Sequence, residues 1–168
     1  MKEYNSVSEP FLADVRAVVG DANVFTEPEK LEQYKTDEEY DPRRFRVPEA
    51  VVRPANAEEI AAVVKLCNKY NVPLTVRSGG TSLADGAIAV CGGIVLLMER
   101  LNKIIEMNTE AMYVVAEAGV RTVDIQKMAN EAGYLYAGDP CSAESCLIGG
   151  NLATNAGGSK AVRYGVTR

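Results

Sequence analysis

Ten consecutive residues, Arg77 to Gly86 (RSGGTSLADG), have the composition of an anion-binding turn, with three glycines, two serines and one threonine. They follow a run, Pro73–Arg77, that reads as a strand. Glycine allows the sharp turns that bring several backbone N–H groups to one point, and such a nest of donors favours an anion. The stretch therefore predicts an anion site with Arg77 as a candidate cation, although a surface turn with a solvated arginine is the plainer reading.

A second segment of similar character lies near the end of the chain. It runs from Gly138 to Ser142 and then through Ile148–Gly158, IGGNLATNAGG. Two such segments from separate parts of one chain suit a single extended ligand that carries more than one negative charge.

Other chemistries fit the sequence poorly. The chain contains no histidine, which removes the commonest general base near neutral pH and the commonest metal ligand. A nucleotide-binding P-loop has its glycine spacing at Gly133–Gly138, but Asp139 stands where the lysine is required. Cys141 and Cys146 have the C-x4-C spacing of one iron–sulfur cluster motif, but the third cysteine of that motif would fall at Gly149. We therefore interpret both cysteines as small residues of a tight loop.

The composition predicts a globular domain without nucleic-acid or membrane partners. The 168 residues are 47% hydrophobic and 24% charged, which suits one ordinary domain. A formal net charge of -5 opposes binding to phosphate backbones and anionic lipid. No apolar run is long enough for a signal peptide or a membrane span. We therefore expect a cytoplasmic protein with reduced cysteines.

The order of predicted elements indicates a βαβ unit ahead of the first glycine-rich stretch. A short strand at 50–53, a helix opened by Asn56 and Glu59, and a strand at 72–77 predict a parallel pair with a right-handed crossover. The stretch then leaves the carboxyl end of the second strand, where parallel α/β units bind ligands. The segment 36–46 (TDEEYDPRRFR) lacks periodicity and is predicted to be loop.

The remaining elements are predicted from periodicity and end signals. Helices are expected to begin at Ser8, Thr26 and Thr122. The buried faces are expected to include Phe11, Leu12, Val15, Val18 and Val19 in the first helix and Ile60, Val63, Val64 and Cys67 in the helix after Asn56. Further strands are expected at 94–98, 104–107, 113–117 and 134–136.

Three motifs in order resemble the N-terminal part of the vanillyl-alcohol oxidase/p-cresol methylhydroxylase flavoprotein family. They are VRPANAEEIAAVVKLCNKYNVPLTVRSGGTSLADGA, then VAEAGV, then DPCSAESCLIGGNLATNAGG. Within the family they are most similar to D-lactate dehydrogenases and glycolate oxidase FAD subunits. The resemblance runs from about Leu31 to Arg168, which is most of the chain.

The resemblance implies an α+β fold of the p-cresol methylhydroxylase (PCMH) type, truncated here, with FAD between two subdomains. The implied divisions are N-terminal helices and loop at 1–46, a βαβ-containing first subdomain at 47–108 and the start of a second α+β subdomain at 109–168. The substrate-binding cap domain is absent from this sequence. The residues implied to bind the pyrophosphate are Arg77, Ser78, Gly79, Gly80, Thr81 and Ser82. Those implied along the pyrophosphate, ribityl chain and flavin ring are Pro140, Ser142, Cys146, Gly149, Gly150, Asn155 and Ala156.

The sequence departs from the family pattern in two ways that bear on the site. Many relatives have glycine where Ser78 and Asp85 stand, and we expect the Asp85 carboxylate to point outward from the pyrophosphate. The covalent flavin link of some relatives uses a histidine, so the FAD is expected to be noncovalent here.

The implied reaction is oxidation of a 2-hydroxy acid of the D-lactate or glycolate type by hydride transfer to flavin N5. In the resembled enzymes a cap-domain histidine takes the hydroxyl proton. No residue here is assigned as catalytic, because the nearest carboxylates, Glu117 and Asp139, are typical of solvated turns. The resemblance also implies an electron-transferring flavoprotein or an iron–sulfur subunit as partner. The alternatives are a noncatalytic FAD-carrying subunit that needs a partner chain, and the same fold acting on another alcohol.

Overall fold

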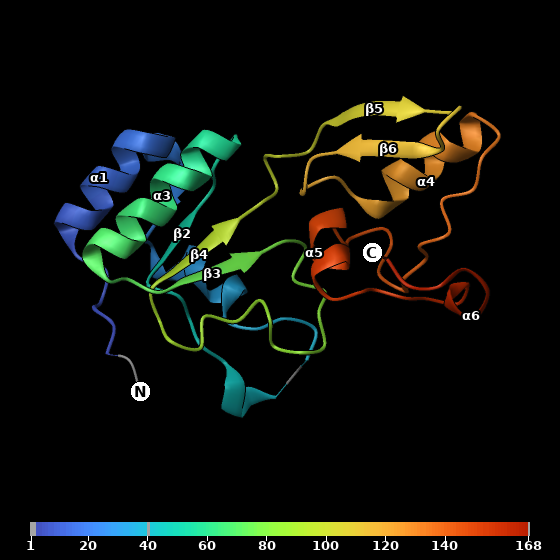
Figure 1. Cartoon of the computed structure of the whole chain (residues 1–168). Helices are drawn as coiled ribbons and strands as arrows, with labels where there is room; N and C mark the ends of the chain where they lie inside the picture. The colour runs from blue at the N-terminus through green and yellow to red at the C-terminus, as the bar shows by residue number, and fades with distance from the viewer. Residues whose placement is uncertain (1–2, 40, 168) are drawn as a thin grey trace. The chain divides into compact units, whose positions relative to one another are not determined.

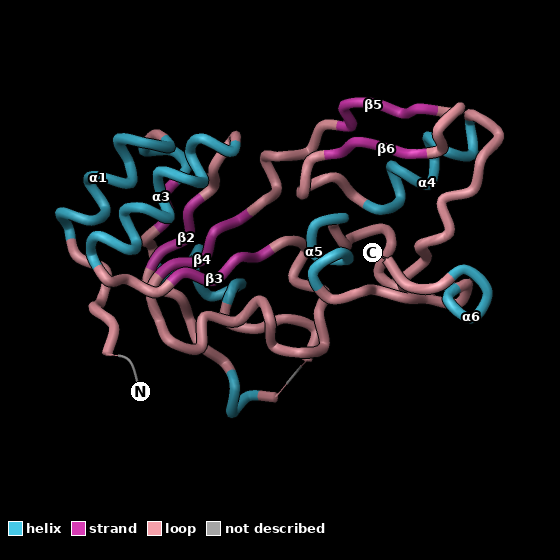
Figure 2. Tube along the Cα trace, viewed as in Figure 1, coloured by secondary structure: helices cyan, strands magenta, loops and turns pink. Residues whose placement is uncertain are grey.

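The computed structural model describes residues 3–39 and 41–167 and has the mixed α+β architecture predicted from the sequence. Backbone contacts divide the chain after Arg100 into two compact units. Figure 1 shows the order of the elements, and Figure 2 separates helices, strands and loops by colour. The three-part division of the sequence stays a prediction.

The first unit is built on a four-stranded sheet in the order β1-β2-β4-β3. Strands β2 (Ala50–Val52) and β3 (Leu74–Arg77) each pair in parallel with β4 (Ile94–Leu97), and β1 (Val24–Phe25) pairs antiparallel with β2. Helix α3 (Ala57–Tyr70) connects β2 to β3. The predicted direct pairing of the strands at 50–53 and 72–77 is therefore wrong, because β4 lies between them.

The burial of β4 explains its central place. All four residues of β4 are buried, whereas β3 exposes half of Val76. A strand that is apolar on both faces belongs inside a parallel sheet, and the less apolar strand takes the edge. Periodicity within one segment does not reveal this order, because both strands are short apolar runs.

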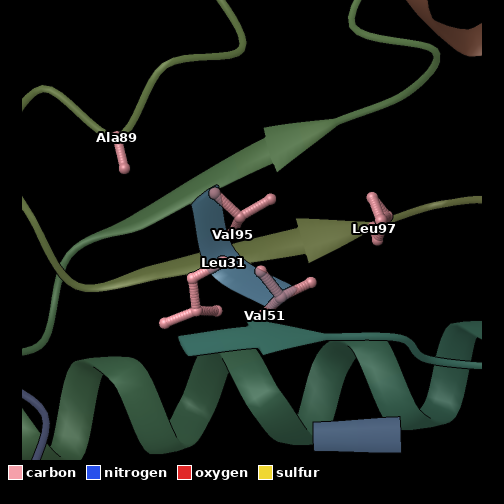
Figure 3. Close-up of a cluster of buried hydrophobic side chains, with 5 residues drawn as sticks. All are labelled: Leu31, Val51, Ala89, Val95 and Leu97. Carbon is pink, nitrogen blue, oxygen red and sulfur yellow. The ribbon is translucent and has the colours of Figure 1, made fainter. Parts of the chain in front are cut away.

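Layers cover the sheet of the first unit on both faces. Helices α1 (Glu9–Val19) and α3 pack side by side (Figure 1). Val51 and Val95 lie on one face of the sheet, where they contact a second set of side chains. Their neighbours in sequence point to the opposite face and are Ala50, Val52, Ile94 and Leu96. Figure 3 shows this cluster, which consists of Leu31, Val51, Ala89, Val95 and Leu97. Leu31 comes from α2 (Pro28–Leu31).

The predicted helix starts differ in how well they match the structure. Asn56 caps α3: its side chain accepts a hydrogen bond from Glu59 N at 2.8 Å, and Glu59 accepts one from Ala55 N at 2.7 Å. Ser8 occupies the N-cap of α1 but makes no side-chain capping bond. The predicted start at Thr26 is wrong, because α2 begins at Pro28 after Glu27.

Helical faces also depart from prediction in one place. The expected inner face of α3 is buried at Val63 and Cys67, but Val64 is 39% exposed.

Burial raises the pKa of the Cys67 thiol to about 11, so the thiol is neutral at physiological pH. Short 3₁₀ helices complete the unit at Asp21–Asn23 (η1), Glu32–Tyr34 (η2) and Pro42–Arg44 (η3).

The second unit joins an antiparallel hairpin to three helices. The hairpin consists of β5 (Ile104–Asn108) and β6 (Tyr113–Ala116), and the helices are α4 (Thr122–Glu131), α5 (Ile148–Ala153) and α6 (Ala161–Tyr164). Its core cluster is Val120, Ile125 and Ile148, with Ile104, Val114, Ala116 and Tyr136 packed against it. The predicted strands at 104–107 and 113–117 and the helix from Thr122 are confirmed within a residue.

The strand predicted at 134–136 is wrong. Helix α4 ends in a turn in which Gly133 has a φ of +81° and Tyr134 N donates to Ala129 O at 2.8 Å. The chain then continues without a strand partner among the described residues. Alternating aromatic residues resemble a strand in sequence, but a strand also needs a neighbouring edge with which to pair.

The two N-caps give a matched test of the first unit. We expect Asn56→Ala to lower the free energy of unfolding by about 1 kcal/mol, because it removes a capping bond from α3. Ser8→Ala should change it by less than about 0.5 kcal/mol, since Ser8 makes no such bond. Urea unfolding followed by circular dichroism measures both. Equal effects of the two substitutions would contradict the assignment of Asn56, and not Ser8, as a side-chain cap.

Candidate functional site

The loop after β3 presents a run of backbone donors without internal acceptors. Within the described part of the chain, no hydrogen bond uses the backbone N–H groups of residues 78–83. The loop is fixed at Ser82, whose carbonyl accepts from Glu38 N at 3.0 Å and whose Oγ accepts from Ala84 N at 3.1 Å. A shaped loop with unpaired N–H groups at the carboxyl end of a parallel strand is suited to an anionic ligand.

Arg77 supports this loop from within the protein. Its Nη1 donates to Thr36 O at 2.7 Å, and its guanidinium carbon lies 5.7 Å from the centre of the Tyr34 ring. Burial lowers the pKa of Arg77, and the carboxylate of Asp37 opposes that shift. The side chain therefore anchors the loop while keeping a positive charge beside it.

Gly80 leaves the space that the Arg77 guanidinium fills. Its φ is +69°, and a Cβ built there would lie 2.1 Å from Arg77 Nη2. Gly80 is therefore required both for its backbone conformation and for this close contact.

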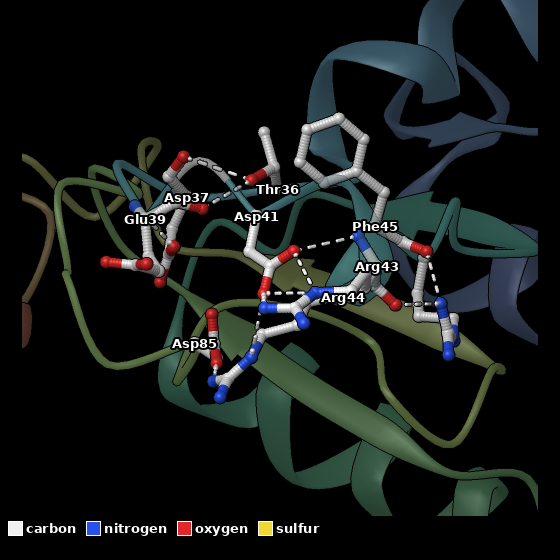
Figure 4. A network of polar contacts seen from close by, with 9 residues as sticks. Thr36, Asp37, Glu39, Asp41, Arg43, Arg44, Phe45 and Asp85 are labelled. Atoms are coloured by element: carbon white, nitrogen blue, oxygen red, sulfur yellow. Dashed lines mark hydrogen bonds and ion pairs between the residues drawn. The ribbon is translucent and has the colours of Figure 1, made fainter.

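The segment 36–46, which we call the flanking segment, contacts this loop through its described residues, 36–39 and 41–46. Thr36 Oγ1 donates to the carbonyls of Asp37 and Glu39 at 3.2 and 3.1 Å, and Glu39 N donates to Asp37 Oδ1 at 3.0 Å (Figure 4). Asp41 accepts from Arg43 N at 3.1 Å and so caps η3. The sequence signal for this cap is an aspartate followed by proline at the first helical position.

Asp85 is paired with an arginine that sequence analysis did not identify. Its side chain is only 14% exposed and forms an ion pair with Arg44 of the flanking segment (Figure 4). Its Oδ1 is buried and has no hydrogen-bond partner in the described residues. The expectation that this carboxylate points outward from the pyrophosphate stays a prediction, and the structure adds that an arginine distant in sequence provides its counter-charge.

The second glycine-rich segment uses most of its backbone donors internally. Gly149 N donates to Ala118 O at 2.9 Å, and Ala156 N donates to Asn151 O at 2.8 Å. A Cβ on Gly149 would lie 2.8 Å from the Ala118 Cβ, so this glycine permits close packing of α5. The N–H groups of Cys146, Gly150 and Asn155 also donate to carbonyls of the same unit.

Cys146 belongs to a buried polar cluster that sequence analysis missed. Its Sγ lies 3.2 Å from Thr122 Oγ1, which accepts from Asn151 Nδ2 at 2.5 Å. All three side chains are buried. The cluster ties the start of α4 to α5, so the Cys146 thiol has a structural environment.

The other predicted positions of this segment form a turn and an exposed corner. Pro140 O accepts from Ala143 N at 2.9 Å, and Ser142 O accepts from Cys146 N at 2.7 Å. Asn155 is exposed and has a φ of +51°. No hydrogen bond within the described chain uses the backbone N–H of Ser142, which leaves this donor available.

The two nearby carboxylates are both engaged in structural contacts. Asp139 lies 3.1 Å from Lys160 Nζ and 3.2 Å from Gln126 Nε2, and the hydrogen bond from Lys160 is the main cause of its lowered pKa. Glu117 accepts from Lys103 N at 2.8 Å. Neither is placed as a free general base.

An apolar pocket of about 540 Å³ lies within the second unit, between the hairpin, α4 and α5. Met107, Val114, Tyr136 and Leu152 are among its walls, and no charged residue lines it. The pocket therefore offers neither a cation for a phosphate nor a general base. In the described chain, no group of histidine, cysteine or acidic residues could hold a metal ion, and no helix has the length and apolar character needed to cross a membrane.

Comparison with known proteins gives consistent matches. A family model described as FAD binding domain matches residues 48–168. The chain is 41% identical over 121 residues to D-lactate dehydrogenase of Anaerostipes hadrus, and 36% identical over 127 residues to glycolate oxidase subunit GlcD of Bacillus subtilis. These alignments cover 72% and 76% of the chain but 25% and 27% of the relatives. The structure of p-cresol methylhydroxylase matches with a TM-score of 0.66 and 26% identity, over 76% of this chain and 26% of that one.

These matches confirm the family resemblance and the PCMH-type fold inferred from the three motifs. The chain spans about a quarter of the length of the two curated relatives named above. The individual cofactor contacts of residues 77–82 and 140–156 stay predictions.

Two glycines of the first loop provide a matched pair of substitutions. We expect Gly80→Ala to lower the free energy of unfolding by about 1–2 kcal/mol, because its backbone has a positive φ and the new Cβ would displace the Arg77 guanidinium. Gly86→Ala should be neutral or slightly stabilising, since nothing lies within 4 Å of its Cβ position. Urea denaturation tests both, and a Gly80 variant as stable as the parent would contradict the packing described.

Proposed function

Because the chain belongs to the FAD binding domain family, we propose that residues 77–82 bind the diphosphate of a noncovalently held FAD. The observation that carries the proposal is the run of unpaired N–H groups at 78–83, at the carboxyl end of β3. Neutral main-chain donors suit a ligand with two negative charges in a protein whose net charge is -5. The loop fits the group chemically, since the N–H groups of residues 78–83 are unused within the described chain and Gly80 lets the Arg77 guanidinium place a positive charge beside them.

Each residue of the first loop has a separate part in this proposal. Ser78, Gly79, Gly80 and Thr81 supply backbone donors, and Ser82 fixes the loop through its carbonyl and hydroxyl. Arg77 acts mainly by holding the loop to Thr36, because one of its N–H groups is committed there.

We propose that the second segment contributes along the pyrophosphate, ribityl chain and flavin ring. The predicted residues divide by environment into two groups. Ser142 has an unused backbone donor and Asn155 has an exposed side chain, so both are available for contact. Cys146 and Gly149 act by packing, which holds the segment in shape. Backbone atoms are the proposed contacts at three further positions, Pro140, Gly150 and Ala156.

The relatives support oxidation of a 2-hydroxy acid as the proposed reaction. They include a glycolate oxidase subunit and a D-lactate dehydrogenase. Bound FAD supplies the hydride acceptor for oxidation of the carbon that bears the hydroxyl group. The residues described here bind and orient the cofactor, and none is assigned as the base that takes the hydroxyl proton. We propose that further polypeptide supplies this base and the substrate contacts, and that electrons pass to a flavoprotein or iron–sulfur partner.

A second candidate function is an FAD-carrying subunit that is inactive without a partner chain. It is favoured by the structural contacts that occupy the carboxylates of Glu117 and Asp139, and by the absence of histidine from the given sequence. The third candidate function is that of an oxidoreductase with the same fold that acts on another alcohol.

Titration with FAD tests the cofactor site. We expect the purified chain to bind FAD in the micromolar range with quenched flavin fluorescence, and to release it unmodified after acid precipitation. Gly79→Val and Gly80→Val should weaken binding by about tenfold or more, because a branched side chain reshapes the loop after β3 (residues 78–86), which we call the donor loop. Gly86→Val is the control, since its Cβ position is open. Failure of the parent chain to bind FAD would overturn the proposal.

Turnover tests the proposal that the chain alone supplies no catalytic base. The FAD-loaded chain alone should not oxidise D-lactate or glycolate with an artificial electron acceptor, because it contains no assigned base. Reduction of the acceptor by the chain alone, at a rate above that of free FAD, would rule out the noncatalytic reading and show that an unassigned residue acts as base.

A further inference from the structure

We propose that Arg44 is a positioning residue for the diphosphate site, where its ion pair with Asp85 holds the donor loop and cancels the only carboxylate in it. The inference rests on the proposed function, because it concerns the same loop. Asp85 is the one acidic residue in the stretch 77–86. It follows Ser82 by three positions, so the two Cα atoms are at most about 11 Å apart.

The backbone fixes Asp85 in an unusual place. Its φ is +57°, a left-handed conformation that aspartate tolerates better than most residues but that glycine adopts freely. The side chain is turned into the protein, with 14% exposure and a buried Oδ1 that has no hydrogen-bond partner in the described residues. A carboxylate in this position is shielded from water, so its charge acts strongly on its surroundings.

A diphosphate at the donor loop would be repelled by that charge if nothing cancelled it. Arg44 provides the cancellation: its guanidinium pairs with Asp85 and lies 3.8 Å from Asp41 Oδ2. Among the ion pairs of the described residues, Asp85 has Arg44 as its only partner. The pair therefore makes an acidic residue compatible with an anion site.

The same pair also joins two segments that are far apart in sequence. The flanking segment contacts the donor loop at three points, through Thr36 O with Arg77, Glu38 N with Ser82 O, and Arg44 with Asp85 (Figure 4 shows the last). The first two involve backbone atoms and persist in side-chain variants at position 44. Arg44 thus controls the charge of the loop without being its sole support.

A purely structural ion pair and a charge-compensating one predict different results. If the pair only holds the loop, removing either partner should weaken FAD binding alike. If Arg44 cancels Asp85, removing Arg44 leaves a repulsive carboxylate, while removing Asp85 leaves a favourable cation. The two single variants should then differ in sign or at least in size.

The test is FAD titration of the purified chain and a set of variants. We expect Arg44→Gln to weaken binding about tenfold, with the loss reduced at high salt. Arg44→Lys should bind within about threefold of the parent, because the charge is kept. Asp85→Asn should bind as tightly as the parent or more tightly, and the double variant R44Q/D85N should recover most of the affinity lost in R44Q.

Arg43→Gln is the matched control. Arg43 is the neighbouring arginine on the same 3₁₀ helix. Its side chain is 89% exposed, and among the described residues it forms an ion pair with Asp41 alone. Its substitution should leave FAD affinity unchanged. Backbone amide hydrogen exchange of residues 78–86 in the FAD-free variants gives a second readout, and it should be similar in R44Q and D85N if both lose the same contact.

The outcomes are distinguishable. If the parent does not bind FAD, the proposed function fails and this inference fails with it. If the parent binds but R44Q binds equally well, only the inference is overturned. A loss in D85N equal to that in R44Q, without recovery in the double variant, also overturns it, because the pair would then be structural alone.

Discussion

The two-sided burial of β4 is the constraint on which the rest of the first unit depends. Ile94 lies in register between Ala50 of β2 and Leu74 of β3, and both neighbours run parallel to it. Parallel neighbours end at the same edge of a sheet, so the loop after Arg77 emerges where several strand ends meet. Gly93 makes this packing possible: its φ is +72°, and a Cβ there would lie 2.1 Å from Pro73 O. The site is thus positioned by a close backbone approach at the opposite end of β3.

The donor loop differs from the sheet in how its backbone N–H groups are used. Backbone N–H groups in the sheet are satisfied by neighbouring strands, whereas those of residues 78–83 find no acceptor among the described residues and must be satisfied by water or a ligand. The flanking segment holds this loop through Thr36 O, Glu38 N and Arg44. A charged network of Asp41, Arg44 and Asp85 therefore replaces an apolar core at this edge of the unit.

The sequence predicted what depends on local pattern and missed what depends on partners. The capped helix from Asn56 and the hairpin strands were recognised because their signals lie within a few residues. The central place of β4 was missed because sheet order depends on which strand is buried on both faces. The segment 134–136 has the alternation of a strand but no edge with which to pair. Helix α5 was not predicted because glycines at positions 149 and 150 oppose a helix unless packing requires them.

The two glycine-rich segments show why composition alone does not identify an anion site. In the first, Gly80 makes room for the Arg77 guanidinium, and the N–H groups of residues 78–83 are unused within the described part of the chain. In the second, Gly149 packs on Ala118 and Gly158 on Asp139 O, where added Cβ atoms would lie 2.8 and 1.8 Å away, and most donors are consumed internally. Glycines permit close contacts in both segments, but the first segment presents its N–H groups, whereas the second uses most of them internally. The difference appears only when each N–H group is followed to its acceptor, and it makes residues 78–83 the stronger candidate for the diphosphate.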